Sequence, residues 1–207
     1  MSEVIGSVTV WHNKPMLLPL FGFLAGILPA LAAIPYVRDI LKLKTKPHRA
    51  SFLIWAVLGA IAFFSQLAEG ATWSLFLPAA DTLAVLVIFA LSIKHGVGGF
   101  NKKDKVALVL AAIGLLLWYV TDEPLFALGI TIGVDAIATV LTIHKTYQSP
   151  HSETFSAWFL ATMGGFFAIF AVGSLSWELL VYPVYIFIAN GSVNIVILLR
   201  KNKVLAD

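Results

Sequence analysis

Two carboxylates, Asp81 and Asp135, lie within long apolar stretches of this 207-residue chain. An ionisable side chain in the hydrocarbon region of a membrane costs about 2.5–3.5 kcal/mol on insertion scales, so it usually faces a bundle interior or a cavity. No Lys or Arg lies at a similar depth to neutralise either group, and burial disfavours the charged form of a carboxylate. We therefore expect the protonated form of Asp135 to be accessible near neutral pH. Both residues are candidates for proton or cation coupling; the alternative is that they form hydrogen bonds between helices.

Asparagine and tryptophan side chains form a second set of candidates, for solute binding. Asn190 and Asn194 are four residues apart and so share one helical face. Their amides donate and accept hydrogen bonds, which suits a solute with hydroxyl or amide groups. Trp55 and Trp158 lie near one end of two other apolar stretches. These two tryptophans line a solute site or belong to an interfacial aromatic belt, and both interpretations stay open.

Other chemistries find little support in the sequence. The chain has no cysteine, which excludes disulfides and thiolate chemistry. Its histidines show no spacing typical of a metal site. The last apolar stretch contains no interior lysine for a retinal Schiff base, and no buried Ser–His pairing is expected. We therefore predict no enzymatic activity, no metal and no cofactor.

The elements that must position these residues are membrane helices. The chain is 59% hydrophobic with a mean hydropathy of +0.91, and apolar windows of the length that spans a bilayer recur throughout. The sequence predicts an all-α integral membrane protein with seven transmembrane helices. Their expected ranges are 16–41, 52–68, 72–93, 105–121, 124–144, 154–174 and 177–199.

Positive charge alternates along the connections between these helices. All but one of the 14 Lys and Arg residues fall on one side of the predicted bundle, Lys14 being the exception. Basic residues mark the cytoplasmic side of a membrane protein. We expect the N-terminus outside and the C-terminus inside, in a bacterial inner (cytoplasmic) membrane. The net charge of +3 is therefore a topology signal and does not indicate nucleic-acid binding.

The chain also repeats itself. With a constant offset of 103 residues, the region around Trp55 aligns without gaps with the region around Trp158, and ten positions are identical. Three helices invert the chain direction, so a fourth must restore it before a parallel copy begins. We predict a 3+1+3 arrangement with two parallel three-helix repeats. The segments are 1–15 outside the membrane, 16–94 and 124–200 as repeats, 95–123 as link and linker helix, and 201–207 as a cytoplasmic tail.

The residues of the first copy resemble a known family. Pro35 and Tyr36 are followed by a basic turn, Lys44-Thr45-Lys46, and then by Ser51. This order resembles the Pro–Gln, Lys-Thr-Lys-Ser pattern of PQ-loop repeats in the SWEET sugar transporter and cystinosin superfamily. The chain looks like a divergent member, because Tyr36 stands in place of Gln and the second copy has an Ala-Thr pair there.

The resemblance implies an alternating-access carrier of a small polar solute such as a sugar or an amino acid. SWEET-type carriers use an asparagine of helix 7 and a tryptophan of helix 6, for which Asn190 and Trp158 are the counterparts. Proton-coupled members place an aspartate in the first helix of the second repeat, as Asp135 is placed here. The partners implied are a small-molecule solute and the lipid bilayer, and a homo-oligomer stays open. The alternative function is a non-transporting receptor or cargo-binding protein built on the same bundle.

Three prolines fall inside or near the ends of predicted helices: Pro35, Pro78 and Pro183. Proline removes a backbone donor and kinks a helix. They are candidate gating hinges, with static kinks as the alternative.

Overall fold

The computed structural model describes residues 17–68, 76–99, 101–121, 124–173 and 177–204. This part of the chain is all-helical, and apart from the short 3-10 helix η2 (Pro150–Ser152) it forms seven α-helices. They are α1 (Leu17–Leu41), α2 (Arg49–Ala68), α3 (Phe76–His95), α4 (Lys102–Tyr119), α5 (Pro124–Gln148), α6 (Phe155–Ala171) and α7 (Trp177–Val204). No strand forms within the described ranges, where an isolated β-bridge joins His48 to Val97.

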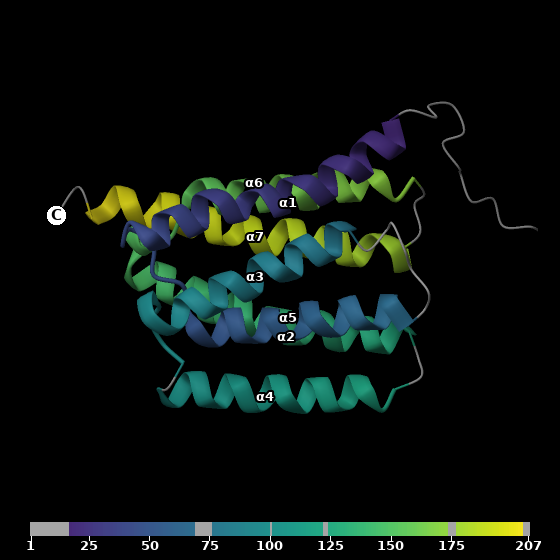
Figure 1. Cartoon of the computed structure of the whole chain (residues 1–207), viewed down its shortest axis with the longest axis horizontal. Coiled ribbons are helices and arrows are strands. Elements are labelled where there is room, and N and C mark those ends of the chain that lie inside the picture. The colour runs from purple at the N-terminus through teal and green to yellow at the C-terminus, as the bar shows by residue number, and fades with distance from the viewer. Residues whose placement is uncertain (1–16, 69–75, 100, 122–123, 174–176, 205–207) are drawn as a thin grey trace, which may run out of the picture.

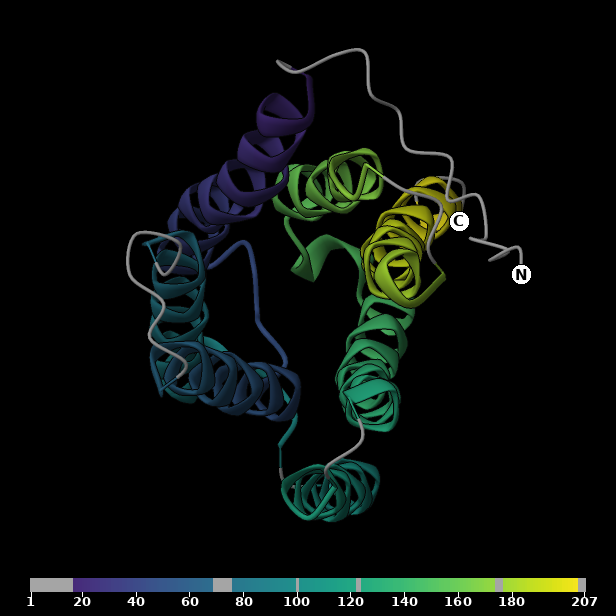
Figure 2. The same cartoon turned by 90° about the vertical axis from the view of Figure 1, so that its right-hand side faces the viewer.

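The helices run side by side, and six of them form a ring (Figures 1 and 2). Following the contacts around it, the order is α2, α3, α1, α6, α7, α5 and back to α2. Helix α4 lies outside the ring against α5 and α2. The connections α1–α2, α3–α4 and α5–α6 gather at the end of the bundle where α7 also ends (Figure 1). We call this the basic end, because Lys42, Lys44 and Lys46 of the α1–α2 connection and Lys94 in the last turn of α3 lie there.

The composition of the helices indicates a membrane-embedded protein. Three of them contain stretches long and apolar enough to cross a bilayer: Leu17–Leu41, Leu125–Gln148 and Leu179–Lys201. Helices α2 and α6 contribute shorter apolar stretches. Large apolar side chains also cover the outside of the bundle, as Leu83 on α3 and Leu116 on α4 show. Such an exposed apolar surface is suited to lipid rather than water.

Local sequence explains several helix ends. Proline is favoured in the first turn of a helix, where its missing N–H leaves no bond unmade, and α5 begins at Pro124. The side chain of Asn101 caps α4 by accepting a hydrogen bond from the backbone N–H of Asp104 at 2.9 Å. Leu43 adopts a positive φ of 59° in the turn after α1. A non-glycine residue rarely adopts this conformation, so the turn at this point is tightly determined.

Several predicted boundaries were wrong by a few residues, and the larger shifts at the basic end lengthen the helices. Helix α2 begins at Arg49 rather than 52, α5 continues to Gln148 rather than 144, and α7 runs to Val204 rather than 199. The predicted tail from 201 is therefore helical as far as 204. Apolar windows stop at the first charges, whereas a helix continues because long basic side chains extend toward water from its last turns. The predicted segment 1–15 lies outside the described residues.

Candidate functional site

A cavity of about 500 Å³ lies inside the ring of six helices. Every helix of the ring contributes to its wall, and α4 does not. This volume falls within the range of small-molecule sites, roughly 300–1,000 Å³. The cavity is therefore large enough for a metabolite-sized solute.

Small residues on α1 and α6 make room for the cavity while bringing these two helices close together. Gly164 and Gly165 on α6 both line it, as do Ala25 and Pro29 on α1. A Cβ placed on Gly164 would lie 2.5 Å from Cγ of Pro29. Glycine at this position is thus a requirement of the α1–α6 packing.

Four aromatic side chains close the cavity toward the basic end; we call them the aromatic floor. Trp55 on α2 meets Trp158 on α6 with ring centroids 5.9 Å apart. Tyr36 on α1 lies 5.4 Å from Phe52 on α2 and 6.5 Å from Trp158, and Phe52 lies 5.1 Å from Trp55. These contacts form a closed cycle of tilted and edge-to-face pairs, the arrangement that aromatic quadrupoles favour.

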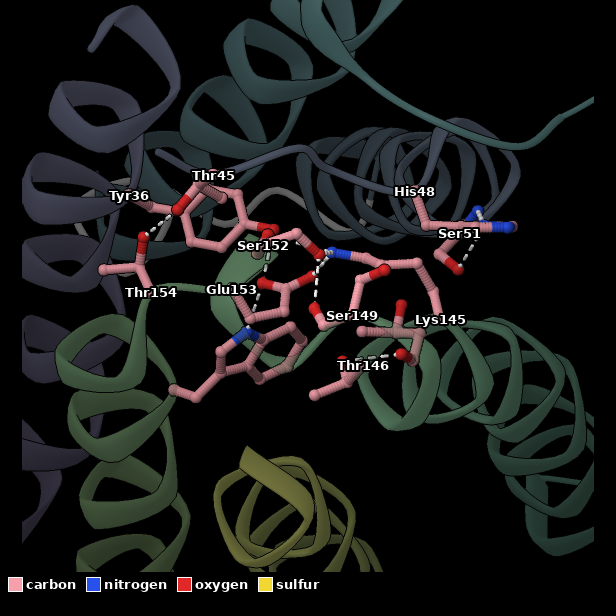
Figure 3. A network of polar contacts seen from close by, with 12 residues as sticks. Tyr36, Thr45, His48, Ser51, Lys145, Thr146, Ser149, Ser152, Glu153 and Thr154 are labelled. Atoms are coloured by element: carbon pink, nitrogen blue, oxygen red, sulfur yellow. Dashed lines mark hydrogen bonds and ion pairs between the residues drawn. The ribbon is translucent and has the colours of Figure 1, made fainter. Parts of the chain in front are cut away.

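Glu153 binds two members of the aromatic floor, and its contacts with Tyr36 and Lys145 are drawn in Figure 3. One carboxylate oxygen, Oε2, accepts hydrogen bonds from Tyr36 Oη and Trp158 Nε1, both at 2.8 Å. The other, Oε1, pairs with Lys145 Nζ at 2.5 Å. The Glu153 side chain is fully inaccessible to solvent, and Lys145 also donates to the backbone oxygen of Ser152 at 3.0 Å. We call these residues the Glu153 latch, because they join α1, α5 and α6 in a single polar network.

Hydroxyl groups at the starts of α2 and α6 connect these ends to α5 and α1. Ser51 at the start of α2 donates to the backbone oxygen of Ala138 in α5 at 2.7 Å. Thr154 just before α6 donates to Asp39 of α1 at 3.0 Å and contacts Thr45 at 2.6 Å. Ser51 and Thr154 are 103 residues apart, which is the offset of the sequence alignment. The aligned hydroxyls therefore make similar contacts with two different helices.

A second polar cluster links the loop before α2 to α4. His48 Nε2 lies 3.3 Å from Asp104 Oδ1, and His48 Nδ1 lies 3.1 Å from Ser51 Oγ. Burial lowers the pKa of His48 below its usual value; Asp104 opposes this effect in part and Lys145 adds to it. The lowered pKa favours the neutral form of the His48 imidazole over the charged form.

The contact between His48 and Ser51 corrects the expectation that no buried Ser–His pairing exists. The order Asp104, His48, Ser51 is that of a nucleophile triad. Ser51 is fully buried, however, and its single hydroxyl proton goes to the Ala138 oxygen. No substrate can reach this hydroxyl, so the cluster is structural.

The two carboxylates lie in the cavity wall on two different helices, α3 and α5. Asp135 on α5 accepts hydrogen bonds at Oδ2 from Tyr185 Oη at 2.5 Å and from Thr139 Oγ1 at 3.3 Å. Asp81 on α3 forms no hydrogen bond or ion pair with the residues that the structure describes. Tyr182 of α7 also lines the cavity and lies within electrostatic reach of both carboxylates.

The structure brings most of the predicted site residues together. Six of the nine line the cavity: Trp55, Trp158, Asn190, Asp81, Asp135 and Pro183. Trp158 is only 8% exposed, which places it inside the bundle rather than in an aromatic belt at the lipid surface.

The other three predicted residues do not line the cavity within the described residues. Asn194 lies one turn beyond Asn190, where its amide nitrogen donates to Thr162 Oγ1 of α6 at 2.9 Å. Its inclusion among the solute-binding residues is corrected, because the contact with α6 covers it. Pro35 lies inside the continuous helix α1 and outside the cavity lining. Pro78 falls in the first turn of α3, and its side chain lies outside the part that the structure describes.

Sequence reasoning missed the residues that close the cavity. Glu153 lies in a connection, and Lys145 was interpreted only as a topology signal. In the sequence, Tyr36 is notable only because it stands where PQ-loop repeats have glutamine. The one available signal was Glu153 itself, an acidic residue in the predicted connection that also contains Lys145. Its burial depends on contacts with α1 that no local spacing indicates.

The described residues contain no group of three or more His, Asp or Glu side chains placed to hold a metal ion. No protein-family model matches the chain, and no curated protein or solved structure shows significant similarity to it.

Proposed function

We propose that this chain is a membrane carrier that moves a small polar solute by alternating access, in the manner of the SWEET and PQ-loop transporters that its motifs resemble. The observation that carries the proposal is the cavity of about 500 Å³ lined by all six helices of the ring. A carrier needs such a solute-sized space between two halves that can move against each other. The solute is a sugar, an amino acid or a similar metabolite.

The contact pattern supports the division into two equivalent three-helix halves. In helices 1–3, α3 touches both α1 and α2, and in helices 5–7, α7 touches both α5 and α6. Between the halves, α1 packs on α6 and α2 packs on α5, which are equivalent pairs. The aligned residues Trp55 and Trp158 meet each other. This is what a rotation axis between parallel repeats requires, so the 3+1+3 arrangement is the topology that we propose.

The aromatic floor and the Glu153 latch supply a closed gate at the basic end. By the positive-inside rule this end faces the cytoplasm. The N-terminus then lies outside and the C-terminus lies in the cytoplasm, with the bundle in a bacterial inner membrane. Breaking the contacts of Glu153 with Tyr36 and Trp158 would separate α1 from α6 at this end. We therefore assign the latch to the inward-closed state of the carrier.

Asp135 is the residue to which we assign proton coupling. It lies in the cavity wall with hydroxyl donors and no Lys, Arg or His among the described lining residues. Asp135→Asn keeps the size and the hydrogen-bonding capacity of the side chain but cannot titrate. In proteoliposomes, this variant should lose accumulation driven by a pH gradient while still equilibrating the solute down its own gradient.

The experiment is uptake of a broad panel of radiolabelled sugars, amino acids and small amines into proteoliposomes, with and without a pH gradient. Asp81→Asn is tested in parallel, since this carboxylate lies in the same cavity and is the other candidate for coupling. If both variants accumulate solute like the parent chain, neither carboxylate couples and the protein is a facilitator. Saturable binding without any flux would favour the receptor function instead.

A further inference from the structure

The charge of the cavity restricts what it can hold. Its described lining contains two carboxylates, Asp81 and Asp135, and no Lys, Arg or His. Carboxylates at membrane depth are stable only when a proton or a cation neutralises them. No described protein cation lies within the cavity to do so. The compensating charge must therefore come from the solute or from protons.

The position of the two carboxylates suits one ligand between them. They lie on α3 and α5, which belong to opposite three-helix halves and do not touch each other within the described residues. Both line the same cavity as Tyr182 of α7, which lies within electrostatic reach of each. A cationic group there would be attracted from both halves.

The aromatic floor adds an independent feature that favours a cation. Trp55 and Trp158 line the same cavity, and the Trp55 side chain adjoins the Asp135 carboxylate. The face of an indole ring attracts ammonium and quaternary ammonium groups, most strongly when water is excluded. Carboxylates and indole rings that line the same cavity form a site that selects a positive organic group over a neutral one of the same shape.

We propose that the solute of this cavity is a small organic cation whose charged group lies between Asp81 and Asp135, and that it exchanges with protons bound by the same carboxylates. The proposal rests on the carrier function stated above and adds the substrate class and the direction of coupling. Binding of one cation releases one proton from the carboxyl group that it contacts. Protonation of that carboxylate on the other side of the membrane releases the cation. Cations and protons therefore move in opposite directions.

The titratable groups that face the two carboxylates are few. In the described residues they are Tyr182 and Tyr185 on α7, and Tyr36 is the other titratable side chain of the lining. Tyrosine is neutral around pH 7, with an unperturbed pKa of about 10. The pH dependence of cation binding between about pH 5 and 8 should thus report the carboxylates alone.

The test uses the full chain, purified in detergent, with choline and putrescine as probes. Each is paired with an uncharged analogue of similar shape. For choline the analogue is 3,3-dimethyl-1-butanol, in which carbon replaces the charged nitrogen, and for putrescine it is 1,4-butanediol. We expect saturable binding of at least one cation by equilibrium dialysis, and at least tenfold weaker binding of its neutral partner. The cation affinity should fall as the pH is lowered. Asp81→Asn and Asp135→Asn should each weaken it at least tenfold, whereas Leu83→Ala on the outer surface of α3 should not.

Flux measurements separate this proposal from the carrier function. In liposomes loaded with a pH-sensitive dye, cation uptake should drive proton efflux, and an imposed pH gradient should drive cation accumulation. Transport of neutral sugars or amino acids without cation binding would overturn the substrate class and leave the carrier function standing. Selective cation binding without flux would overturn the exchange mechanism and the carrier function while leaving the charge selectivity of the site. Equal binding of the cations and their neutral analogues, or no cation binding by a folded chain, would overturn the inference.

Discussion

Removing the cation of the Glu153 latch is the sharpest test of the structure. Lys145→Met keeps most of the side-chain length but leaves the Glu153 carboxylate without its positive partner. The carboxylate retains its bonds from Tyr36 and Trp158, yet it is fully inaccessible to solvent. Breaking a buried ion pair from one side costs about 3–5 kcal/mol, because the remaining charge is uncompensated.

This cost translates into a measurable loss of stability. A change of 1 kcal/mol shifts the melting midpoint of a chain of this size by about 2–4 °C. We therefore expect Lys145→Met to lower the midpoint by roughly 6–20 °C, measured by intrinsic tryptophan fluorescence in detergent. Lys42→Met is the matched control, since Lys42 occupies the same position in the first copy and is exposed. Its effect should stay within about 0.5 kcal/mol.

A double-mutant cycle isolates the interaction between the two charges. Glu153→Gln in the Lys145→Met background removes the unpaired carboxylate, so the double variant should recover part of the stability lost by Lys145→Met alone. The coupling energy should exceed about 1 kcal/mol, as expected for groups in direct contact. A midpoint for Lys145→Met equal to that of the parent, or strictly additive effects, would refute the assignment of a buried ion pair at this site.

Three further predictions concern other parts of the bundle. Because the pKa of His48 is lowered in the folded chain, the unfolded chain binds protons more readily, and stability should fall as the pH drops below about 6.5; His48→Gln should flatten this dependence in melting curves between pH 5 and 8. Gly164→Ala should destabilise by about 1–3 kcal/mol, because its Cβ meets Pro29, whereas Gly133→Ala, with open space around it, should not, and equal midpoints for the two variants would contradict the α1–α6 packing. A single cysteine at position 44 should resist an impermeant thiol reagent added outside intact cells and react after permeabilisation; labelling of Lys44→Cys from outside would contradict the proposed topology.

The sequence predicted the helical framework because membrane helices leave a strong and local signal. Apolar windows located all seven helices to within a few residues. Connections rich in Lys and Arg alternate with connections that contain neither, and this alternation identified the basic end. The offset of 103 residues aligned Trp55 with Trp158, which meet in the structure at 5.9 Å. Intramembrane carboxylates are costly, so Asp81 and Asp135 stood out from sequence alone, and both lie in the cavity wall.

The latch could not be predicted, because its signal is neither local nor periodic. Glu153 bonds to Tyr36, which lies 117 residues away in the chain. A glutamate in a polar loop ordinarily stays in water, and only the packing of α1 against α6 removes it from solvent. Asn194 shows the opposite error. Its spacing from Asn190 placed both residues on one helical face. In the structure, however, the amide nitrogen of Asn194 donates a hydrogen bond to Thr162 Oγ1 of α6.

In the proposed 3+1+3 arrangement, the two aligned copies differ where their chemistry demands it. Residues near the proposed two-fold axis meet their own counterparts, so an aromatic pair such as Trp55 and Trp158 can be kept in both copies because the rings attract each other. Two like carboxylates in such a position would repel. At the offset of 103 residues, the positions that correspond to Asp135 and Glu153 hold Ala32 and Ala50. Each carboxylate therefore occurs once, and under this proposal the latch belongs to one half of the bundle.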